Sequence, residues 1–424
     1  MRFRPNFHAT RAGVPIFIWL IRGALGASND GDLAIALDSQ NYPQLVWTVP
    51  TNAVLHLEST TNVASGSWAE LPLRDLQITT LGERIFAQDL TSAWPVKFYR
   101  LRSTRISSLG AHASQGRRPD TVKYLKDLGA SWMRVNAFLD GNDVSLTNFL
   151  EADINLVVTF AYRDPANVRT DFGTLSDWPN GGFPFRSKAE YQQGIRAALS
   201  PLVPYLAFGH QVWVQCENEI GDVSVAPQGR FWRGTTPDYL VQLEALFDAV
   251  REINADIPVI LTSFASENLD AVLDPSSATY NFQTNRIITL LTQGRYDVAD
   301  LHFYGCAEDI PAKVQWIEQR MPAGTRWITT ETSGPDFRCP GTPIHWQNNP
   351  ILFENIEAEQ VTNRFDLCVG NGASVCLWFS LFDLQNESEV FNHLGLLEPP
   401  DQPNGTPRKK PAYYAFQRYT ASHH

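Results

Sequence analysis

The feature that most constrains the fold is a regular alternation of short apolar runs with longer segments of helical periodicity, which begins near Arg105. This alternation is typical of βα units, in which helices connect parallel strands. The predicted strands are 106–113, 131–136, 154–162, 211–219, 257–264, 296–304, 326–331 and 374–380. The predicted helices include 119–128, 188–205, 237–254, 312–321, 356–370 and 411–419. Eight repeats favour an α/β fold of the closed (β/α)8 TIM-barrel type.

An open doubly wound sheet would instead require a glycine-rich phosphate loop after its first strand. The segment from Gly110 to Gly116 is a poor match to such a loop. The signal for the helix after the fourth strand, 237–254, is strong: Thr236 is expected to cap it, Pro237 suits its first turn, and Asp238 complements its dipole. One apolar stripe then follows at helical spacing, formed by Leu240, Leu243, Phe247, Val250 and Ile253.

The N-terminal part of the chain has a different character. In residues 1–28, Arg2, Arg4 and Arg11 precede an apolar stretch, which small residues follow, a pattern that predicts an export signal. Residues 29–104 carry short alternating runs separated by turn residues, which predict a small β-sandwich-like domain. Residues 105–424 form the predicted barrel. Because of the predicted export signal, we expect the protein to be secreted, periplasmic or cell-surface, with no stable membrane insertion after the signal is removed.

Charge and cysteine content restrict the partners. The formal net charge of -11 argues against nucleic acid or an anionic membrane as the main partner and favours a neutral substrate. Of five cysteines, Cys306 and Cys339 fall in neighbouring predicted loops and are the expected disulfide. Cys216, Cys368 and Cys376 lie in apolar segments and are expected to be buried thiols.

Four predicted strands end in polar residues, where a buried strand would otherwise stay apolar. The second ends at Asn136, the fourth at Glu219, the sixth at Tyr304 and the seventh at Glu331. Active sites of such barrels lie at the C-terminal strand ends, and strands four and seven face each other across the mouth. Strand alternation predicts that Glu219 shares a face with Glu217 and Gln215.

Two facing carboxylates are the requirement of retaining glycoside hydrolysis. One protonates the departing oxygen while the other attacks the anomeric carbon, at a separation of about 5–5.5 Å; about 6.5–9.5 Å would favour inversion. We therefore expect Glu219 to be the acid/base and Glu331 the nucleophile. Arg134 is expected to keep Glu331 ionised, Asn218 to bind a sugar hydroxyl, Tyr304 to bond Glu331, and Trp378 to form the floor under the sugar. His302, His112 and Trp232 complete the predicted supporting residues, although His302 alone also fits a hydrogen-bonded core histidine.

The barrel region resembles the large clan of retaining glycosidases with catalytic glutamates on strands four and seven, and within it families 39 and 5. The resemblance spans about residues 105–419 and is carried by Asn218-Glu219, by 231–239, by 327–332 and by 377–380. It implies Glu219 as acid/base and Glu331 as nucleophile, with Arg134, Asn218, His302, Tyr304 and Trp378 at supporting positions. Ile220 and Gly221 follow Glu219, whereas many relatives carry proline there, so the resemblance does not identify the substrate.

Three alternatives stay open. In the first, the barrel binds polysaccharide without cleaving it. In the second, it is a transglycosidase with the same glutamates. In the third, it is a metal-dependent hydrolase that uses His112, His302 and Asp300. No metal or cofactor is required by the expected mechanism. The predicted partner is a carbohydrate of the xylan, glucan or mannan class, whose cleft walls would include Trp178, Phe183, Trp232 and Trp346. Sequence does not determine linkage, endo or exo action, or oligomeric state.

Overall fold

A computed structural model describes residues 8–11, 14–17, 33–37, 43–49, 52–61, 67–81, 84–90, 98–113, 118, 120–140, 146–224, 231–336, 339, 345–384, 389–400 and 405–423. Contacts divide the chain into two compact units. The first contains Met1–Ile106 together with Leu202–Gln211, and the second contains Ser107–Pro201 together with Val212–His424.

Two larger antiparallel sheets and one two-stranded sheet belong to the first unit. One of the larger sheets has the order β3 (Ala34–Leu37), β4 (Pro43–Thr48), β8 (Arg84–Asp89), β7 (Leu76–Leu81), and the other has the order β6 (Ala69–Glu70), β5 (Ala53–Thr60), β9 (Phe98–Arg105). Strands β1 (His8–Arg11) and β2 (Val14–Phe17) pair within the segment predicted as an export signal, the rest of which lies outside the described residues.

Side chains from both larger sheets share one apolar core. Trp47 of β4, Leu55 of β5 and Ile85 of β8 belong to it, and so does Phe208. Trp47 also donates its indole N–H to the Ala207 carbonyl at 3.0 Å. The segment containing α4 (Val203–Leu206) therefore belongs to this core.

That segment corrects one sequence prediction. A single helix was expected over 188–205, but α3 (Lys188–Leu199) ends before a 3-10 turn at Ser200–Leu202. Pro201 and Pro204 lack the backbone N–H that a continuing helix needs, so the chain turns instead.

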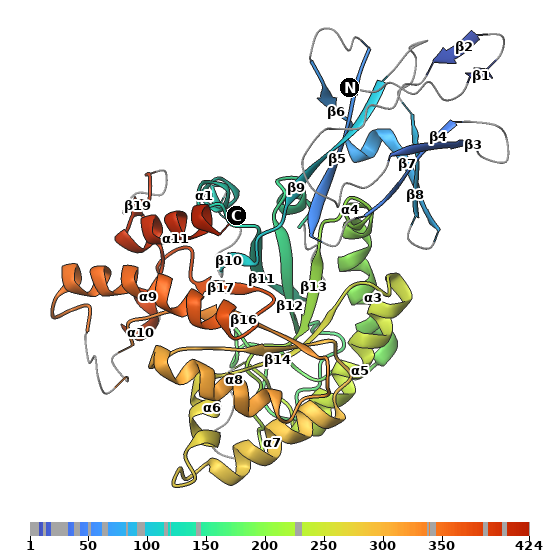
Figure 1. The fold of residues 1–424 in the computed structure, drawn as a ribbon. Coiled ribbons are helices and arrows are strands. Elements are labelled where there is room, and N and C mark those ends of the chain that lie inside the picture. The colour runs from blue at the N-terminus through green and yellow to red at the C-terminus, as the bar shows by residue number, and fades with distance from the viewer. Residues whose placement is uncertain are drawn as a thin grey trace. The chain divides into compact units, whose positions relative to one another are not determined.

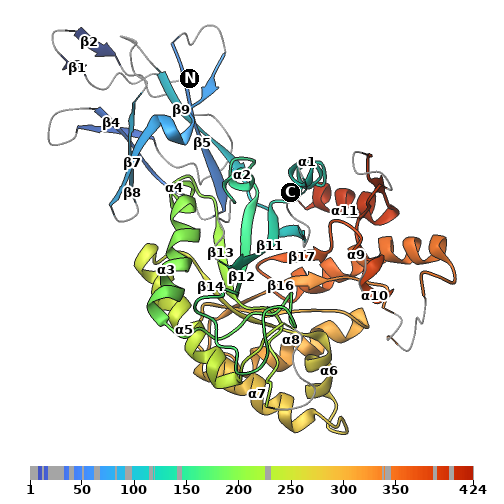
Figure 2. The same cartoon turned by 180° about the vertical axis from the view of Figure 1, so that it is seen from behind.

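The second unit confirms the predicted eight-stranded barrel. Its strands form a closed sheet in chain order, and each pair of neighbours is parallel. Helices surround these strands (Figures 1 and 2). The strands are β10 (Leu109–His112), β11 (Trp132–Leu139), β12 (Asn155–Tyr162), β13 (Val212–Cys216), β14 (Val259–Phe264), β15 (Val298–Leu301), β16 (Arg326–Thr332) and β17 (Cys376–Phe379).

Each predicted barrel helix has an observed counterpart, and further helices appear that the sequence pattern did not reveal. The unpredicted ones are α2 (Thr147–Leu150), α6 (Ser266–Leu273), α7 (Tyr280–Gln293) and α10 (Glu389–Asn392). The predicted helices correspond to α1 (Thr121–Asp127), α3, α5 (Thr236–Ile253), α8 (Ile310–Glu318), α9 (Pro350–Gly370) and α11 (Pro411–Ser422). Separately, β18 (Leu397–Glu398) pairs antiparallel with β19 (Arg408–Lys409).

The start of α5 differs by one residue from the prediction. Thr235, not Thr236, is the cap: its hydroxyl accepts from the Asp238 N–H, while the Asp238 carboxylate accepts from the Thr235 N–H at 3.0 Å. The Thr236 hydroxyl and N–H instead donate to Asp222. Both threonines therefore fix the loop that connects β13 to α5.

Candidate active site

Three side chains meet at the C-terminal ends of β13, β15 and β16. Glu219, His302 and Glu331 each place one nitrogen or oxygen within 4.8 Å of those of the other two. The side chains of His302 and Glu331 are 0% and 8% exposed, whereas that of Glu219 is 19% exposed. The two sequence-predicted glutamates therefore face each other, and Glu219 is the one that reaches solvent more easily.

Arg134 lies fully buried in β11 and connects these strands. Its Nη1 donates to Glu331 Oε1 at 2.5 Å, and its Nη2 donates to Asn218 Oδ1 at 2.6 Å. Further bonds run from Nη2 to Gln215 and from Nε to Thr159 at 3.0 and 2.8 Å. Several bonds thus fix the guanidinium in place, and its Nη1 is directed at Glu331.

A buried layer beneath the carboxylates continues this network. Gln215 donates to Asp300 Oδ2 at 2.6 Å, and Thr330 donates to the same carboxylate through its hydroxyl and its N–H. Burial raises the pKa of Asp300, but His302, Arg134 and Thr330 lower it below its ordinary value. Asp300 therefore supplies a buried negative charge directly below His302.

His302 stands between the acidic groups. Its Nδ1 lies 2.6 Å from Glu219 Oε1, and its Nε2 lies 3.0 Å from Thr330 Oγ1 and 3.4 Å from Asp300 Oδ2. Burial alone would lower the pKa of His302, but the charges of Glu331 and Asp300 outweigh it and raise that pKa to about 10. The imidazole is therefore a cation that donates toward Glu219.

Glu331 receives donors on both oxygens. Tyr304 donates its hydroxyl to Oε2 at 2.5 Å, opposite the Arg134 bond to Oε1. Burial raises the pKa of Glu331 above its ordinary value, as does Glu219, while His302, Arg134 and Tyr304 act in the opposite direction. Burial raises the pKa of Tyr304 well above its ordinary range, so this hydroxyl keeps its proton and acts as a donor.

The turn that carries Glu219 departs from strand alternation. Strand β13 ends at Cys216, and Glu217 and Glu219 have φ values of 59° and 35°, in the left-handed region. Glu217 points away from Glu219 and accepts from the Tyr162 N–H and the Gln242 amide. The predicted shared face of Glu217 and Glu219 is therefore wrong, because the strand ends before both residues.

Asn218 lies between the two halves of this turn. Its Oδ1 accepts from Arg134 and also from the Ser263 hydroxyl at 2.7 Å. With that oxygen occupied twice, the amide N–H2 is the part of Asn218 left to bind a ligand.

His112, at the end of β10, has its Nδ1 3.8 Å from Glu331 Oε1. The ring is 2% exposed, and neither ring nitrogen has a hydrogen-bond partner. Burial and the charges of Arg134 and His302 hold the pKa of His112 well below its ordinary value, so the ring is neutral. Asn136 of β11 also has a buried side-chain oxygen without a partner. The sequence assigned no role to Asn136, although strand alternation places it on the face of Arg134.

Trp378 does not form the predicted floor of the site. It is fully buried, donates its indole N–H to the Leu394 carbonyl at 3.0 Å and packs edge-on against Phe365 of the outer helix α9. Phe379 is the aromatic residue that faces the site, with ring-centroid distances of 5.0 Å to His112 and 5.9 Å to Tyr304. The prediction chose the wrong member of the pair because these neighbours point to opposite faces of β17.

Two of the predicted cleft walls are core residues. Trp232 and Phe183 are fully buried, and Trp232 donates to the Thr235 carbonyl at 3.2 Å, where it supports the start of α5. Trp178 is half-buried beneath the Arg233 guanidinium, and Trp346 is half-buried and stacked on His393 with centroids 3.8 Å apart. Only Trp178 and Trp346 of the four predicted walls keep accessible surface.

The structure joins Cys306 and Cys339 in a disulfide, with Cα atoms 4.9 Å apart. Cys216, Cys368 and Cys376 are buried free thiols. Within the described part of the chain, two clusters have metal-ligand spacing: Glu219 with His302 and Glu331, and the two bridged cysteines with Glu308. Of the three ligands of the metal-dependent alternative, only His302 belongs to one of these clusters, and His112 and Asp300 belong to neither.

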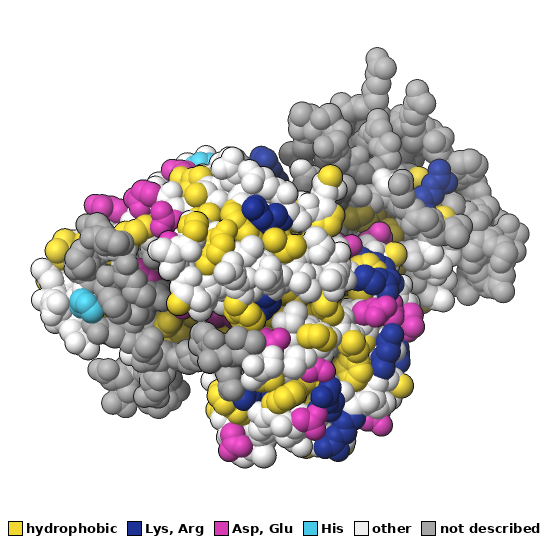
Figure 3. All heavy atoms as spheres, turned by 90° about the horizontal axis from the view of Figure 1, so that it is seen from below, with side chains coloured by type: hydrophobic (Ala, Val, Ile, Leu, Met, Phe, Trp, Pro, Cys, Tyr) yellow, Lys and Arg dark blue, Asp and Glu magenta, His cyan; other side chains and the backbone are white. Residues whose placement is uncertain are grey.

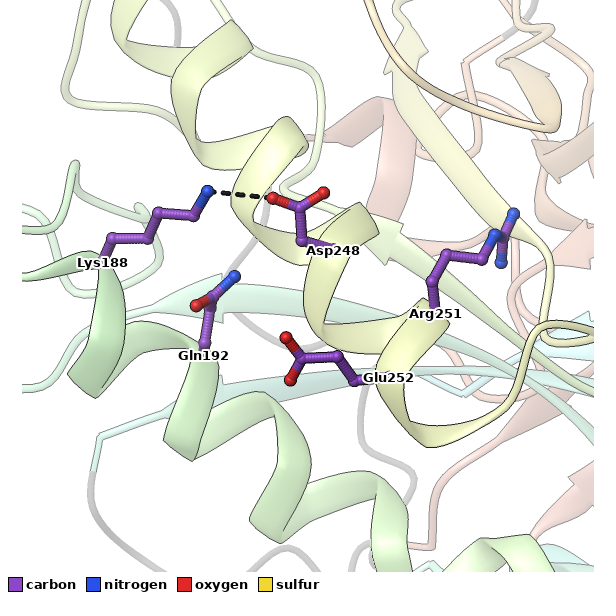
Figure 4. A pocket seen from close by; sticks show the side chains of 5 residues that line it. All are labelled: Lys188, Gln192, Asp248, Arg251 and Glu252. Carbon is purple, nitrogen blue, oxygen red and sulfur yellow. Dashed lines mark hydrogen bonds and ion pairs between the residues drawn. The ribbon is translucent and has the colours of Figure 1, made fainter.

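The structure has further surface features outside the strand ends. A groove between α3 and α5 is lined by Lys188, Gln192, Asp248, Arg251 and Glu252, but the Lys188–Asp248 ion pair of 2.9 Å occupies it (Figure 4). On the face drawn in Figure 3, basic and acidic side chains alternate along the right-hand side, whereas acidic side chains gather at the upper left. None of the described helices combines the length and the apolarity needed to cross a membrane.

Comparison with known proteins gives similar structures but no family. No protein-family model matches the chain, and no curated protein matches it. A β-glucosidase from Exiguobacterium marinum has a TM-score of 0.50 at 11% identity, covering 76% of this chain and 99% of that one. The exo-β-1,4-mannosidase Op5Man5 from Opitutaceae bacterium strain TAV5 has a TM-score of 0.48 at 14% identity, covering 76% of this chain and 60% of that one. GH5_18 from Streptomyces cattleya has a TM-score of 0.49 at 16% identity, covering 75% and 80%.

The chain therefore spans about three fifths of the length of the mannosidase. At such identities, the likeness to the glucosidase shows a shared barrel fold.

Proposed function

We propose that this protein is a retaining glycoside hydrolase that cleaves β-glycosidic bonds between neutral sugars, with Glu331 as nucleophile and Glu219 as acid/base. One observation carries the proposal: carboxylates from β16 and from the turn after β13 approach within 4.8 Å of each other at the barrel mouth. With one oxygen of each no more than 4.8 Å apart, the carboxylates are closer to the separation of about 5–5.5 Å in retaining enzymes than to the water-admitting gap of about 6.5–9.5 Å in inverting ones.

The environments of the two glutamates suit different roles. Burial raises the pKa of Glu331, and the bonds that Arg134 and Tyr304 donate to its two oxygens act against that rise and favour the ionised form that a nucleophile requires. Glu219 is more exposed and can reach both a leaving group and water. Glu331 attacks the anomeric carbon as Glu219 gives its proton to the departing oxygen. Glu219 then takes a proton from water, which displaces the sugar from Glu331.

Neutral recognition groups support the proposed substrate class. A neutral imidazole offers one donor and one acceptor, and His112 has both unpaired beside Glu331. The Asn136 oxygen is a further buried acceptor. Hydroxyl groups both donate and accept, so they match this set, whereas an anion would leave the acceptors unpaired. The aromatic face of Phe379 would contact the sugar ring, in a xylan, glucan or mannan class of substrate.

The disulfide supports a location outside the reducing cytoplasm. This location fits residues 1–28 as the proposed export signal. The proposed accessory β domain is 29–104, and the proposed catalytic barrel is 105–424.

The test uses a panel of aryl β-glycosides and β-linked polysaccharides. Wild type, Glu331→Ala and Glu219→Ala are compared, with Glu217→Gln as a matched control from the same turn. We expect cleavage of at least one neutral β-glycoside, with Glu331→Ala inactive and Glu217→Gln active. Glu219→Ala should keep activity on dinitrophenyl glycosides when azide replaces the base.

Folded wild type that cleaves nothing would contradict the proposal, and binding without cleavage would support the polysaccharide-binding alternative. Products longer than the substrate, formed when acceptor sugars are added, would identify a transglycosidase.

A further inference from the structure

Helix α7 carries an arginine that is almost completely buried. Arg286 is 7% exposed, and its Nη2 donates to Gln283 of the same helix at 2.7 Å. Its Nη1 donates to the Ile220 carbonyl at 2.7 Å, the residue that follows Glu219. Burial lowers the pKa of Arg286 to about 10, and Asp222 partly offsets this effect. Burying a cation carries a large desolvation cost, and the structure directs this one at a backbone carbonyl.

The backbone that Arg286 contacts is an unfavourable one. Glu217 and Glu219 both adopt left-handed φ values, which are unfavourable for a non-glycine residue. Such conformations persist only where surrounding contacts fix them. Weak bonds from β14 hold the N–H side of this turn: the Glu219 N–H donates to Ser263 at 3.2 Å and the Ile220 N–H to Thr262 at 3.3 Å. The carbonyl side is held by Arg286, through a shorter bond to a cation.

We infer that Arg286 is a positioning residue for proton transfer, which holds the turn so that the Glu219 carboxyl meets the glycosidic oxygen. This inference rests on the proposed function. Proton transfer requires an approach of about 2.6–3.2 Å, so a small displacement of the turn removes it. Glu331 lies on β16 and has its own donors, Arg134 and Tyr304. Loss of Arg286 should therefore weaken acid catalysis and leave nucleophilic attack intact.

Leaving-group dependence separates these two steps. A glycoside with a poor leaving group, such as an alkyl glycoside or a disaccharide, needs the proton from Glu219. A dinitrophenyl glycoside departs without it. For Arg286→Met we expect kcat/KM to fall about 10- to 100-fold on the poor leaving group, a fraction of the roughly 10²–10⁴-fold that general acid catalysis supplies. On the dinitrophenyl glycoside it should fall less than about threefold, and azide should raise kcat.

Arg251→Met is the matched control. Arg251 of α5 likewise donates to a backbone carbonyl, that of Ile257 at 2.7 Å, but Ile257 precedes β14 and so lies at the opposite end of the barrel from the carboxylates. Its kcat/KM should be unchanged on both substrates, whatever its effect on stability. Arg286→Lys keeps the cation but cannot make both the Ile220 and the Gln283 bonds in the same geometry. For this variant, kcat/KM on the poor leaving group should fall about three- to tenfold, with little change on the dinitrophenyl glycoside. Arg286→Lys carries the test if Arg286→Met does not fold.

An equal loss on both substrates would overturn the inference and make Arg286 a general structural residue. No loss on either substrate would overturn it as well. Wild type that cleaves no glycoside would instead refute the proposed function, and the inference with it. An active wild type without a selective Arg286 effect would refute the inference alone.

Discussion

The Arg134–Glu331 ion pair gives a stability prediction that does not depend on the substrate. Arg134 is fully buried and Glu331 nearly so, with 2.5 Å between Nη1 and Oε1. Arg134→Met leaves the Glu331 carboxylate buried above Asp300 and removes the bonds to Thr159, Gln215 and Asn218. Removing one partner of a buried pair typically costs about 3–5 kcal/mol. We expect a loss of that size in the free energy of unfolding.

Glu331→Gln should be milder, because it keeps an oxygen for Tyr304 and because Asp300 and Glu219 still lie beside the buried His302 cation. In the double variant the uncompensated carboxylate is gone, so part of the Arg134→Met loss should be recovered. We expect a coupling of about 1–3 kcal/mol. Urea unfolding of the four proteins at neutral pH measures it. Additive effects, within about 0.5 kcal/mol, would refute the claim that these side chains form a buried pair.

Three further predictions follow from single features. Because the pKa of His302 is raised to about 10 in the folded protein, its stabilisation relative to His302→Gln should be complete below about pH 6.5 and disappear as pH rises towards 10; unfolding at pH 6 and pH 9.5 tests the sign. Replacing Cys306 and Cys339 with serine releases a closed loop of 33 residues and should lower stability by about 3–4 kcal/mol, and an unchanged melting temperature would contradict this. Phe379→Ala should lower kcat/KM at least about tenfold, whereas Trp378→Phe should mainly lower thermal stability; the reverse result would restore Trp378 as the floor.

The barrel was predictable because its strands are buried on both faces. Strands β12, β13 and β14 are buried along their whole length, which leaves mostly apolar runs in the sequence. Helices α6 and α7 were missed because Asp274 and Pro275 divide a polar segment into two short pieces. Tertiary packing, more than local pattern, determines their helical state.

The site could be predicted as far as strand ends determine it. Glu219, Glu331, Arg134, His302 and Tyr304 meet because parallel strands deliver their C-terminal residues to one edge of the barrel. Beyond the last strand residue, side-chain direction depends on backbone turns that alternation does not describe.

That limit explains the errors of direction. Glu217 points away from Glu219 because both residues adopt left-handed backbone conformations, which the sequence pattern does not predict for non-glycine residues. Trp378 and Phe379 are neighbours in β17, and β17 pairs with β16 through a register shift, so alternation alone could not assign the inner face. Trp232 follows the turn in a connecting loop, where burial depends on packing against α5.

The most direct test of the central claim is trapping of the covalent intermediate. Wild type is incubated with an activated 2-deoxy-2-fluoro glycoside of a sugar that it cleaves, and the labelled peptide is then located by mass spectrometry. Fluorine slows both steps, and the activated leaving group lets the first proceed, so the sugar accumulates on the nucleophile. We predict one sugar per chain, attached to Glu331. A label on another residue, or rapid cleavage of the parent glycoside with inversion of the anomeric centre and no label, would contradict the account.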